Sequence, residues 1–289
     1  MTIEGLMKAL FEATGRVGFG MVFHAVIGQN AGMAILNETL PLLPWMDPRT
    51  ARLPGVLPLT EAWLEQDDAF AGQMAERDRL IAERPAAVHA LTDGATLAAL
   101  ELFDLVLATL ATRPGYTVDS GRLTRPDGIG VDLDRMAPLL TLGRLVQEDL
   151  CLLERQGDEH VLTGAMLCFP ASWTLAEKIG RPLMAIHRTV APYDADMGRR
   201  VQRMFDLIRH GQPLWRMNSL LYADPTLHAP RLEGDRRPRL GERHYVRCEK
   251  QCFVRLPVSQ AVVFSIHTYV VQADKLPAQA LATLIAGGH

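Results

Sequence analysis

The chain has 289 residues, of which 48% are hydrophobic and 22% charged, and its formal net charge is −3. This length allows one large domain or two small ones, and the composition is that of an ordinary soluble globular protein. There is no basic excess of the kind that nucleic-acid binding requires, so nucleic acid is not an expected partner.

Residues 17–36 (VGFGMVFHAVIGQNAGMAIL) are apolar but interrupted by His24, Gln29, Asn30 and several glycines. The unbroken apolar part, residues 17–23, is far shorter than the roughly 20 residues of a membrane-spanning helix. Lys8 and Arg16 could flank a signal peptide, although the pattern is loose. We expect a buried or peripheral N-terminal segment and no membrane span. The expected domains are an N-terminal extension, residues 1–40, and one domain over residues 41–289.

The next segments predict an irregular stretch and then helices. Residues 41–58 contain five prolines and should be extended. Residues 60–83 predict a helix with Thr60 as its N-cap and Pro85 after its end. Residues 93–112 predict a second helix, apolar almost all round and therefore buried. Residues 117–134 predict a loop with short strands, and residues 136–146 a short helix.

Residues 150–169 predict a β-hairpin. Apolar residues 150–153 are followed by a polar turn containing Gly157, and a second β-prone run ends before Pro170. Cys151 and Cys168 could face each other across this hairpin. Beyond it, His187 follows Ile186 in a largely apolar stretch.

The C-terminal third predicts a helix over residues 194–210, two antiparallel strands over 245–257 and 260–271, and a last helix over 275–286. Hairpin connections of this kind favour an antiparallel sheet with helices packed to one side, an α+β fold. No glycine-rich phosphate loop follows a strand, and no Gly-x-Ser-x-Gly elbow occurs.

The four cysteines, Cys151, Cys168, Cys248 and Cys252, lack zinc-site spacing. Buried free thiols in a reducing compartment are the favoured interpretation, which predicts a cytoplasmic protein.

Charged residues alternate along the first C-terminal strand. Arg247, Glu249, Gln251 and Arg255 share one face. This face is either solvated, or it meets an ion-pair network or an anionic ligand. The adjacent acids Glu148 and Asp149 could supply one buried carboxylate, with the other expected in solvent.

The nine histidines form no HxxxH, HxH or HExxH pattern, so no multi-histidine metal site is indicated. A haem needs only one axial histidine, an apolar cavity and cations for its propionates. His187 and His267 fit that requirement best because each lies in apolar, β-prone sequence. Taken alone, each is more often a satisfied core histidine.

Several segments together resemble the haem-dependent oxidative N-demethylase alpha-subunit-like family. They are PLLPWM, LTEAWLEQDDAFAGQMAERDRLI, ELFDLVLATLATRPG, LVQEDLCLLE, GAMLCFPASWTLAEKIGRPLMAIHRTVAPY and YVRCEKQCFVRLPVSQAVVFSIHTYV, spanning residues 41–271. The resemblance implies a PAS-like antiparallel sheet with flanking helices and a b-type haem (haem b) held by the sheet. It also implies oxidative removal of an N-methyl group from a small methylated amine, using dioxygen and electrons from reductase partner subunits and releasing formaldehyde.

Residue chemistry then suggests roles within this resemblance. His187, in the Ile-His motif after the Phe-Pro-x-x-Trp segment, is the expected axial ligand, with His267 in reserve. Arg247 and Arg255 are expected propionate partners by charge, and Trp173, Phe169 and Tyr269 are expected pocket walls. One departure from the family pattern is Ser219, where Arg216-Met217-Asn218 would be followed by tryptophan.

Two other functions fit the same residues. The chain could be a PAS-like haem-binding sensor or regulatory module without turnover. It could also be a ligand-free scaffold for partner subunits, in which His187 and His267 are only core residues.

Overall fold

The computed structural model describes residues 34–51, 55–187, 195–235 and 243–287. The chain divides between Ala34 and Ile35, and the unit that begins at Ile35 carries the features below. Almost all of the expected N-terminal segment, including His24, lies outside the described residues. Among the described residues, no helix is both long and apolar enough to cross a membrane.

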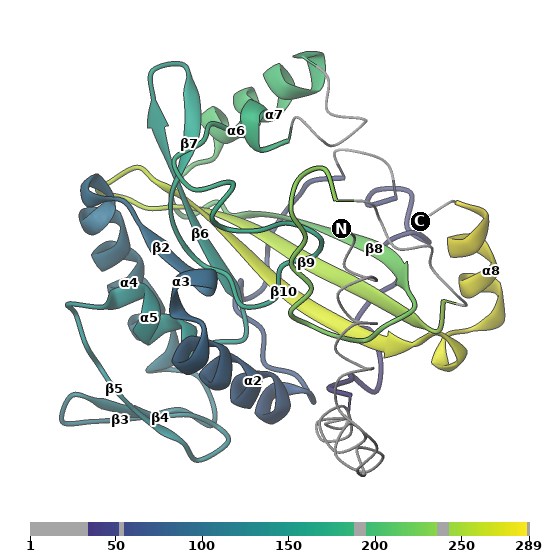
Figure 1. Cartoon of the computed structure of the whole chain (residues 1–289), viewed down its shortest axis with the longest axis horizontal. Coiled ribbons are helices and arrows are strands. Elements are labelled where there is room, and N and C mark those ends of the chain that lie inside the picture. Colours follow the sequence, from purple (N-terminus) through teal and green to yellow (C-terminus); the bar gives the residue numbers. More distant parts are fainter. Residues whose placement is uncertain (1–33, 52–54, 188–194, 236–242, 288–289) are drawn as a thin grey trace, which may run out of the picture. The chain divides into compact units, whose positions relative to one another are not determined.

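One antiparallel sheet organises this unit (Figure 1). In the described residues its strands follow the order β1-β8-β9-β10-β6-β7-β2. The strands are β1 (Leu57–Pro58), β2 (His89–Leu91), β6 (Asp149–Gln156), β7 (Glu159–Met166), β8 (Leu214–Tyr222), β9 (Tyr245–Arg255) and β10 (Val262–Gln272). The prediction of an α+β fold with an antiparallel sheet is therefore confirmed.

Helices and a small second sheet surround the main sheet. The helices are α2 (Phe70–Glu83), α3 (Pro85–Val88), α4 (Thr96–Leu110), α5 (Pro138–Gly143), α6 (Leu183–Ile186), α7 (Ala195–Leu207) and α8 (Ala278–Ala286), with 3-10 turns at Asp93–Ala95 and Ala273–Lys275. The small sheet contains β3 (Thr117–Asp119), β4 (Arg122–Thr124) and β5 (Gly130–Asp132). The expected short strands, the helix after them and the C-terminal elements are all present, with bounds shifted by a few residues.

The hairpin of β6 and β7 forms as predicted, with Gly157 at φ +64° in its turn. This left-handed backbone is the conformation that glycine adopts without steric cost. The expected facing of Cys151 and Cys168 is wrong, because Cys151 pairs with Ala165 and Cys168 lies beyond the end of β7. All four cysteines are buried free thiols, as expected.

The prediction of a helix over residues 60–83 is wrong in its first half, since α2 begins at Phe70. The preceding segment is held by side chains from the entrance of β6. The backbone N–H of Glu65 donates to Glu148 Oε1 at 2.6 Å, and that of Asp67 donates to Gln147 Oε1 at 3.2 Å. These tertiary bonds replace the helical bonds that local propensity favours.

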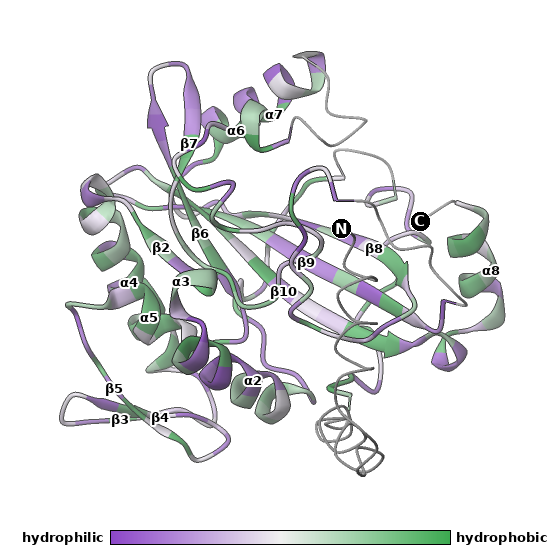
Figure 2. Ribbon diagram, in the orientation of Figure 1, coloured by the Kyte–Doolittle hydropathy of each residue, from purple (hydrophilic) through white to green (hydrophobic). Residues whose placement is uncertain are grey.

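Strand β9 gives the sheet two different faces. By register and alternation, Arg247, Glu249, Gln251, Phe253 and Arg255 lie on one face, called the α7 face because Phe205 of α7 packs on Phe253. The other face, called the α2 face, carries Cys248, Lys250 and Cys252 of β9 with His267 and Tyr269 of β10. Figure 2 shows hydrophilic stretches in the middle of β9, within an otherwise largely hydrophobic sheet.

Three apolar clusters pack around the sheet. The first joins α2, α4 and α5 to Leu150, Leu152 and Val263. The second joins α6 and α7 to Phe253 and Val262, and the third joins α8 and Trp45 to Val246. The polar residues in the middle of β9 and β10 therefore lie between apolar packing at both ends. Helices cover both faces, whereas the sequence pattern indicated one.

Residues before position 41 also contact the sheet. The N–H of Asn37 donates to Val270 O at 2.7 Å, and Asn37 Oδ1 accepts from the N–H of Val270 at 3.0 Å. Asn37 is buried, and its side-chain nitrogen also donates to Asp67 and Asp68. The side chain thus occupies the place of a neighbouring strand at this end of β10.

Candidate functional site

Arg247, an expected propionate partner, is buried and donates to backbone carbonyls. Its Nη1 donates to Leu227 O at 3.0 Å, and its Nη2 donates to Phe169 O and lies 3.4 Å from Glu249 Oε1. Because a guanidinium offers five donors in a fixed fork, one side chain can tie two loops to β9. Its Nε is buried and has no hydrogen-bond partner among the residues that the structure describes.

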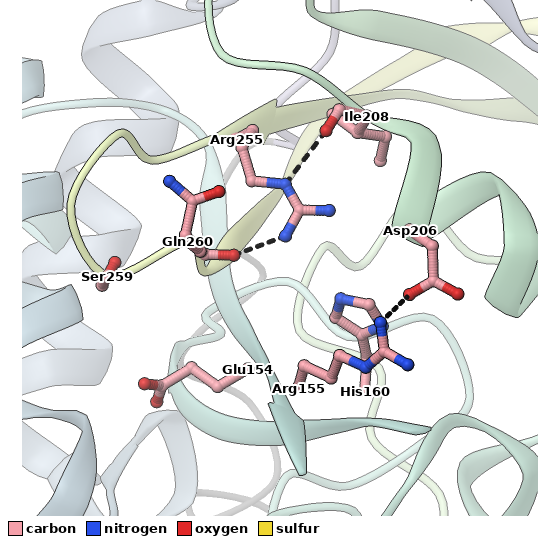
Figure 3. Close-up of a pocket in the computed structure, with 8 residues that line it drawn as sticks. All are labelled: Glu154, Arg155, His160, Asp206, Ile208, Arg255, Ser259 and Gln260. Carbon is pink, nitrogen blue, oxygen red and sulfur yellow. Dashed lines mark hydrogen bonds and ion pairs between the residues drawn. The ribbon is translucent and has the colours of Figure 1, made fainter. Parts of the chain in front are cut away.

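Arg255, the other expected propionate partner, caps the end of α7 (Figure 3). It donates to Phe205 O, to Ile208 O at 3.1 Å and to Gln260 O. A cation at the last carbonyls of a helix satisfies acceptors without an intrahelical partner and opposes the helix dipole. Arg255 therefore has a full structural role in this fold.

A cavity of about 350 Å³ lies beside Arg255. Its walls carry charges of both signs, from Glu154, Arg155, Asp206 and Arg255, and also include the buried His160 (Figure 3). Arg155 pairs with Asp206 at 3.4 Å, and the Nδ1 of His160 contacts Gln202. The positive charges of this cavity are thus largely matched by acids that line it.

His187, the expected axial ligand, is the residue that follows α6 and not part of a strand as its sequence context suggested. Its Nδ1 lies 2.9 Å from Leu183 O. A carbonyl oxygen can only accept, so Nδ1 carries the proton and Nε2 bears the lone pair in the neutral ring. Burial lowers the pKa of His187, and the positive charges of Lys178 and Arg216 lower it further.

Lys178 fixes the backbone just before His187. Its Nζ is buried, donates to Ile186 O at 2.8 Å and pairs with Glu233. Ile186 and Trp173 pack in the same apolar cluster as Phe253 and Phe264 of the α7 face. These contacts hold the end of α6 on the α7 side of the sheet. No local pattern indicates this role of Lys178, because Glu233 lies on a separate loop.

The three expected pocket walls lie in different places. Trp173 is half-buried and packs in the apolar cluster that contains Phe253 and Phe264. Phe169 is buried in the core with the Arg77 guanidinium 5.4 Å from its ring centre. Tyr269 lies on the α2 face against His267, with ring centres 4.5 Å apart. The structure therefore brings Trp173 near the segment of His187 but places Tyr269 across the sheet.

His267, the reserve ligand, is fully engaged on the α2 face. Its Nδ1 lies 3.1 Å from Glu148 Oε1, and its Nε2 lies 2.9 Å from Asp67 Oδ2. Carboxylates only accept, so both ring nitrogens donate and the ring is an imidazolium. Burial alone would lower the pKa of His267, but the hydrogen bonds to Asp67 and Glu148 outweigh it and raise the pKa to about 9. A protonated ring has no lone pair for a metal.

Further polar residues extend this α2-face network. Gln147 Nε2 donates to Asp67 Oδ1 at 2.7 Å and to Gln73 Oε1 at 3.0 Å, and Gln73 donates to Thr268 O at 2.9 Å. Lys250, the cross-strand neighbour of His267, pairs with Glu65. The network links the segment before α2 to β10 through groups that lie far apart in the sequence.

Glu148 and Asp149 are both buried, so the expectation that one of them lies in solvent is wrong. Asp149 has its own partners. It pairs with Arg77 Nη1 at 2.7 Å and accepts from the backbone N–H groups of Cys168 and Phe169 at 2.7 and 2.9 Å. Two adjacent acids are therefore each neutralised by a separate buried cation.

A polar cluster also forms on the α7 face, as the interpretation of an ion-pair network predicts. We call it the α7-face cluster: Arg216, Asn218, Arg247, Glu249 and Gln251. Arg216 lies opposite Gln251, and Asn218 opposite Glu249. Glu249 accepts from Asn218 Nδ2 at 3.1 Å and from Gln251 Nε2 at 3.2 Å. The interpretation of this face as solvated is wrong, since Arg247, Glu249 and Arg255 are all buried.

Arg216 is the member that sequence reasoning did not assign to the site. In the part of the chain that the structure describes, no group accepts a hydrogen bond from it, and its Nε is buried without a partner. Two more atoms on this face are buried without a hydrogen-bond partner in the described residues: the Nε of Arg247 and the Oγ1 of Thr268. Thr268 pairs across the strands with Glu249. Buried polar groups normally have a partner, which can be an ordered water or a ligand.

The charge balance of the α7-face cluster favours an anion. Two arginines face one carboxylate, Glu249. Burial lowers the pKa of Arg216, and the negative charge of Glu249 opposes this effect only in part. Ser219, the departure from the family pattern, pairs across from Cys248 and so lies on the α2 face, away from this cluster. Only its tertiary surroundings distinguish Arg216 from an exposed strand arginine.

The comparison with known families gives one match. A family model described as haem-dependent oxidative N-demethylase, alpha subunit-like, matches residues 58–288. The matched range contains the main sheet apart from Leu57, together with His187, His267 and the whole α7-face cluster.

Proposed function

The chain belongs to the haem-dependent oxidative N-demethylase, alpha subunit-like family, and we propose that it removes an N-methyl group from a small, dimethylamine-like substrate. The family match over residues 58–288 is the observation that carries the proposal. A PAS-like haem-binding domain over residues 41–289 is part of it, supported by the antiparallel sheet with helices on its faces.

His187 is the proposed axial ligand of a b-type haem. The Nδ1–H of a ligating histidine is commonly oriented by a carbonyl, and Leu183 O takes that position here. This arrangement leaves Nε2 with the lone pair that iron requires. The reserve residue His267 is a poorer candidate, because both of its nitrogens donate to carboxylates.

The residues around His187 fit a haem in their chemistry. Trp173, Ile186 and Phe264 supply apolar and aromatic surface, and Arg216, whose Nε has no partner in the described part of the chain, supplies a cation on the same side of the sheet. A haem needs one ligand, an apolar surround and cations for its carboxylates. Arg247 and Arg255 donate chiefly to backbone carbonyls, which leaves Arg216 as the better propionate partner.

When bound, the haem would supply dioxygen activation for oxidation of the methyl carbon. In the balanced reaction a methylated amine, dioxygen, two electrons and two protons give the demethylated amine, formaldehyde and water. The family description names an alpha subunit, which supports reductase partner subunits as the electron source. The four free thiols support a reducing, cytoplasmic location.

The side chains of this chain would hold and orient the reactants. A cationic amine is repelled by the excess positive charge of the α7-face cluster, so it would lie against the apolar side chains Trp173, Ile186 and Phe264. The same apolar surface would exclude water from the reacting carbon. Lys178 would keep His187 in place through its bond to Ile186 O.

Haemin titration of the purified protein tests the ligand. The wild-type protein should develop a Soret band, and His187→Ala should shift or abolish it. His210→Ala is the matched control, because His210 is exposed, and its spectrum should match that of the wild type. A wild-type protein that stays colourless with excess haemin would overturn the proposal.

Turnover separates an enzyme from a haem-binding sensor. Haem-loaded protein supplied with dimethylamine, dioxygen and an artificial reductant should release formaldehyde in proportion to the amine consumed. Haem binding with no formaldehyde from dimethylamine or trimethylamine would instead support a sensory module.

A further inference from the structure

We propose that Arg216 is the carboxylate-binding residue of the α7 face, with Asn218 beside it. The inference rests on the proposed function for the identity of the ligand, but its physical basis is separate. It starts from a guanidinium that lies partly buried in the sheet and has no hydrogen-bond acceptor among the described residues.

The other arginines of this face differ from Arg216 in their partners. Arg247 binds the carbonyls of Phe169 and Leu227, and Arg255 binds three carbonyls around the end of α7. Both are therefore committed to holding the fold. Arg216 holds nothing in the described residues, although its Nε is buried and a buried polar group without a partner is costly. Such a group is explained by a ligand that supplies the missing acceptor.

The ligand should be an anion, and a carboxylate in particular. Glu249, the acid of the cluster, already accepts hydrogen bonds from Asn218 and Gln251 and lies 3.4 Å from Arg247. The planar guanidinium of Arg216 matches a carboxylate in a two-bond geometry. Arg216 lies opposite Gln251 on the same face as Phe253, and the apolar cluster of Phe253 includes Ile186, the residue before the proposed iron ligand.

Two sources could supply this carboxylate: a propionate of the haem, or the carboxylate of an N-methylated amino acid used as substrate. The experiment separates them. The first arm measures the Kd of wild-type, Arg216→Gln and Arg216→Lys proteins for haemin and for haemin dimethyl ester. Metal-free protoporphyrin IX, followed by fluorescence, tests the same contact without iron ligation.

If the source is a propionate, Arg216→Gln should lower the affinity of the protein for haemin and for protoporphyrin IX by about 10- to 100-fold. This is the loss expected for charge-assisted hydrogen bonds. Arg216→Lys should restore part of the affinity. Wild type and Arg216→Gln should bind the dimethyl ester equally, because the ester carries no charge. Arg209→Gln removes an exposed arginine shortly before β8 and should bind haemin like the wild type.

The second arm adds N,N-dimethylglycine or dimethylamine to haem-loaded protein. If the source is the substrate, haemin affinity is unchanged by Arg216→Gln, while dimethylglycine perturbs the Soret band of the wild type and not of the variant. Dimethylamine should then act equally on both proteins. Either pattern supports a carboxylate at Arg216 and names its source.

The Tm of the ligand-free protein tests whether Arg216 has a structural role, because replacing a structural arginine would lower it. Since Arg216 has no protein acceptor in the described residues, Arg216→Gln should leave the ligand-free Tm unchanged or raise it. A clear loss of stability, or unchanged binding of both haemin and dimethylglycine, would overturn the inference. Wild-type protein that fails to bind haemin would overturn the proposed function instead. The role of Arg216 would then be decided by comparing wild type and Arg216→Gln in their binding of protoporphyrin IX and in the change of Tm that dimethylglycine causes.

Discussion

At the scale of single residues, the most unusual group is His267, a buried imidazolium between two carboxylates. Its partners Asp67 and Glu148 come from different parts of the chain, and each accepts from one ring nitrogen. A buried charge is tolerated only when it is paired and hydrogen-bonded, and both conditions hold here. The residue that sequence reasoning kept as a reserve ligand is instead an ionic link between the segment before α2 and β10.

This link predicts a loss of stability at alkaline pH. The pKa of His267 is raised to about 9 in the folded protein, above its ordinary value near 6.5. A raised folded pKa gives stability that is complete below about pH 6.5 and is lost as the pH rises through about 9. Between those values the free energy of unfolding should fall by up to about 1.4 kcal/mol per pH unit. Thermal unfolding from pH 6 to 10 measures this slope.

The slope between about pH 6.5 and 8 belongs to His267. Burial raises the pKa of Cys252 to about 12 and raises that of Tyr269 as well, so these groups ionise first in the unfolded chain and lower the stability of every variant alike above about pH 8.5. His267→Gln should be less stable at pH 6 and should show a flatter profile, whereas His210→Gln should keep the wild-type slope. Parallel profiles for wild type and His267→Gln would contradict the assignment.

At the scale of elements, helix α2 shows how tertiary partners decide where a helix begins. Residues 60–69 have the composition of a helix, yet the N–H groups of Glu65 and Asp67 are taken by side chains from the entrance of β6. Within α2 itself, Gln73 Oε1 accepts from Gln147, and Arg77 Nη1 donates to Gln147 O and to Asp149 at the same entrance. The helix is therefore anchored by buried polar bonds as well as by its apolar face.

The Arg77–Asp149 ion pair should be a main anchor of α2. Asp149→Asn leaves the guanidinium of Arg77 buried without its acid partner, and we expect a loss of about 3–5 kcal/mol in the free energy of unfolding. Urea unfolding measures it. On the same helix, Arg79→Gln breaks exposed pairs with Glu76 and Glu83 and should cost less than about 1 kcal/mol.

A second variant guards against a protein that simply does not fold. Adding Arg77→Met to Asp149→Asn removes the unpaired charge and should restore part of the lost stability. If the double variant is no more stable than Asp149→Asn alone, the ion pair is not the source of the effect.

At the scale of the whole molecule, the central strands of the sheet should be the most stable part. Strands β9 and β10 pair along their whole length and are almost entirely buried, whereas β1 has two residues and lies at an edge. Native-state hydrogen exchange should therefore be slowest in β9, β10 and β6 and fastest in β1 and in the sheet of β3 to β5. Exchange in β10 as fast as in β1 would contradict this order.

The sequence was sufficient to predict what local pattern controls. The β6–β7 hairpin, the β9–β10 pair and helices α4 and α7 follow from alternation, apolar periodicity and glycine or proline at the ends. The order of the strands was not predictable. The pairing of Leu150 with Ser265 joins distant segments, and the local pattern of each segment does not specify its partner strand or the pairing register.

The site was less predictable than the fold for the same reason. Arg216 and Arg255 look alike in sequence, since each is a strand arginine next to an apolar residue. They differ only in that α7 ends beside Arg255 and offers it carbonyls, while Arg216 meets no acceptor in the described residues. Likewise, nothing local to Glu148 indicates that His267 will neutralise it.

The four buried thiols have a practical consequence for the study of this protein. Burial raises the pKa of Cys151, Cys168, Cys248 and Cys252, and the thiolate is the form that reacts with alkylating reagents. The native protein should therefore resist maleimide labelling at neutral pH. A cysteine introduced at the exposed Met136 would then be a single attachment point for a fluorophore or spin label, with no need to replace a native cysteine.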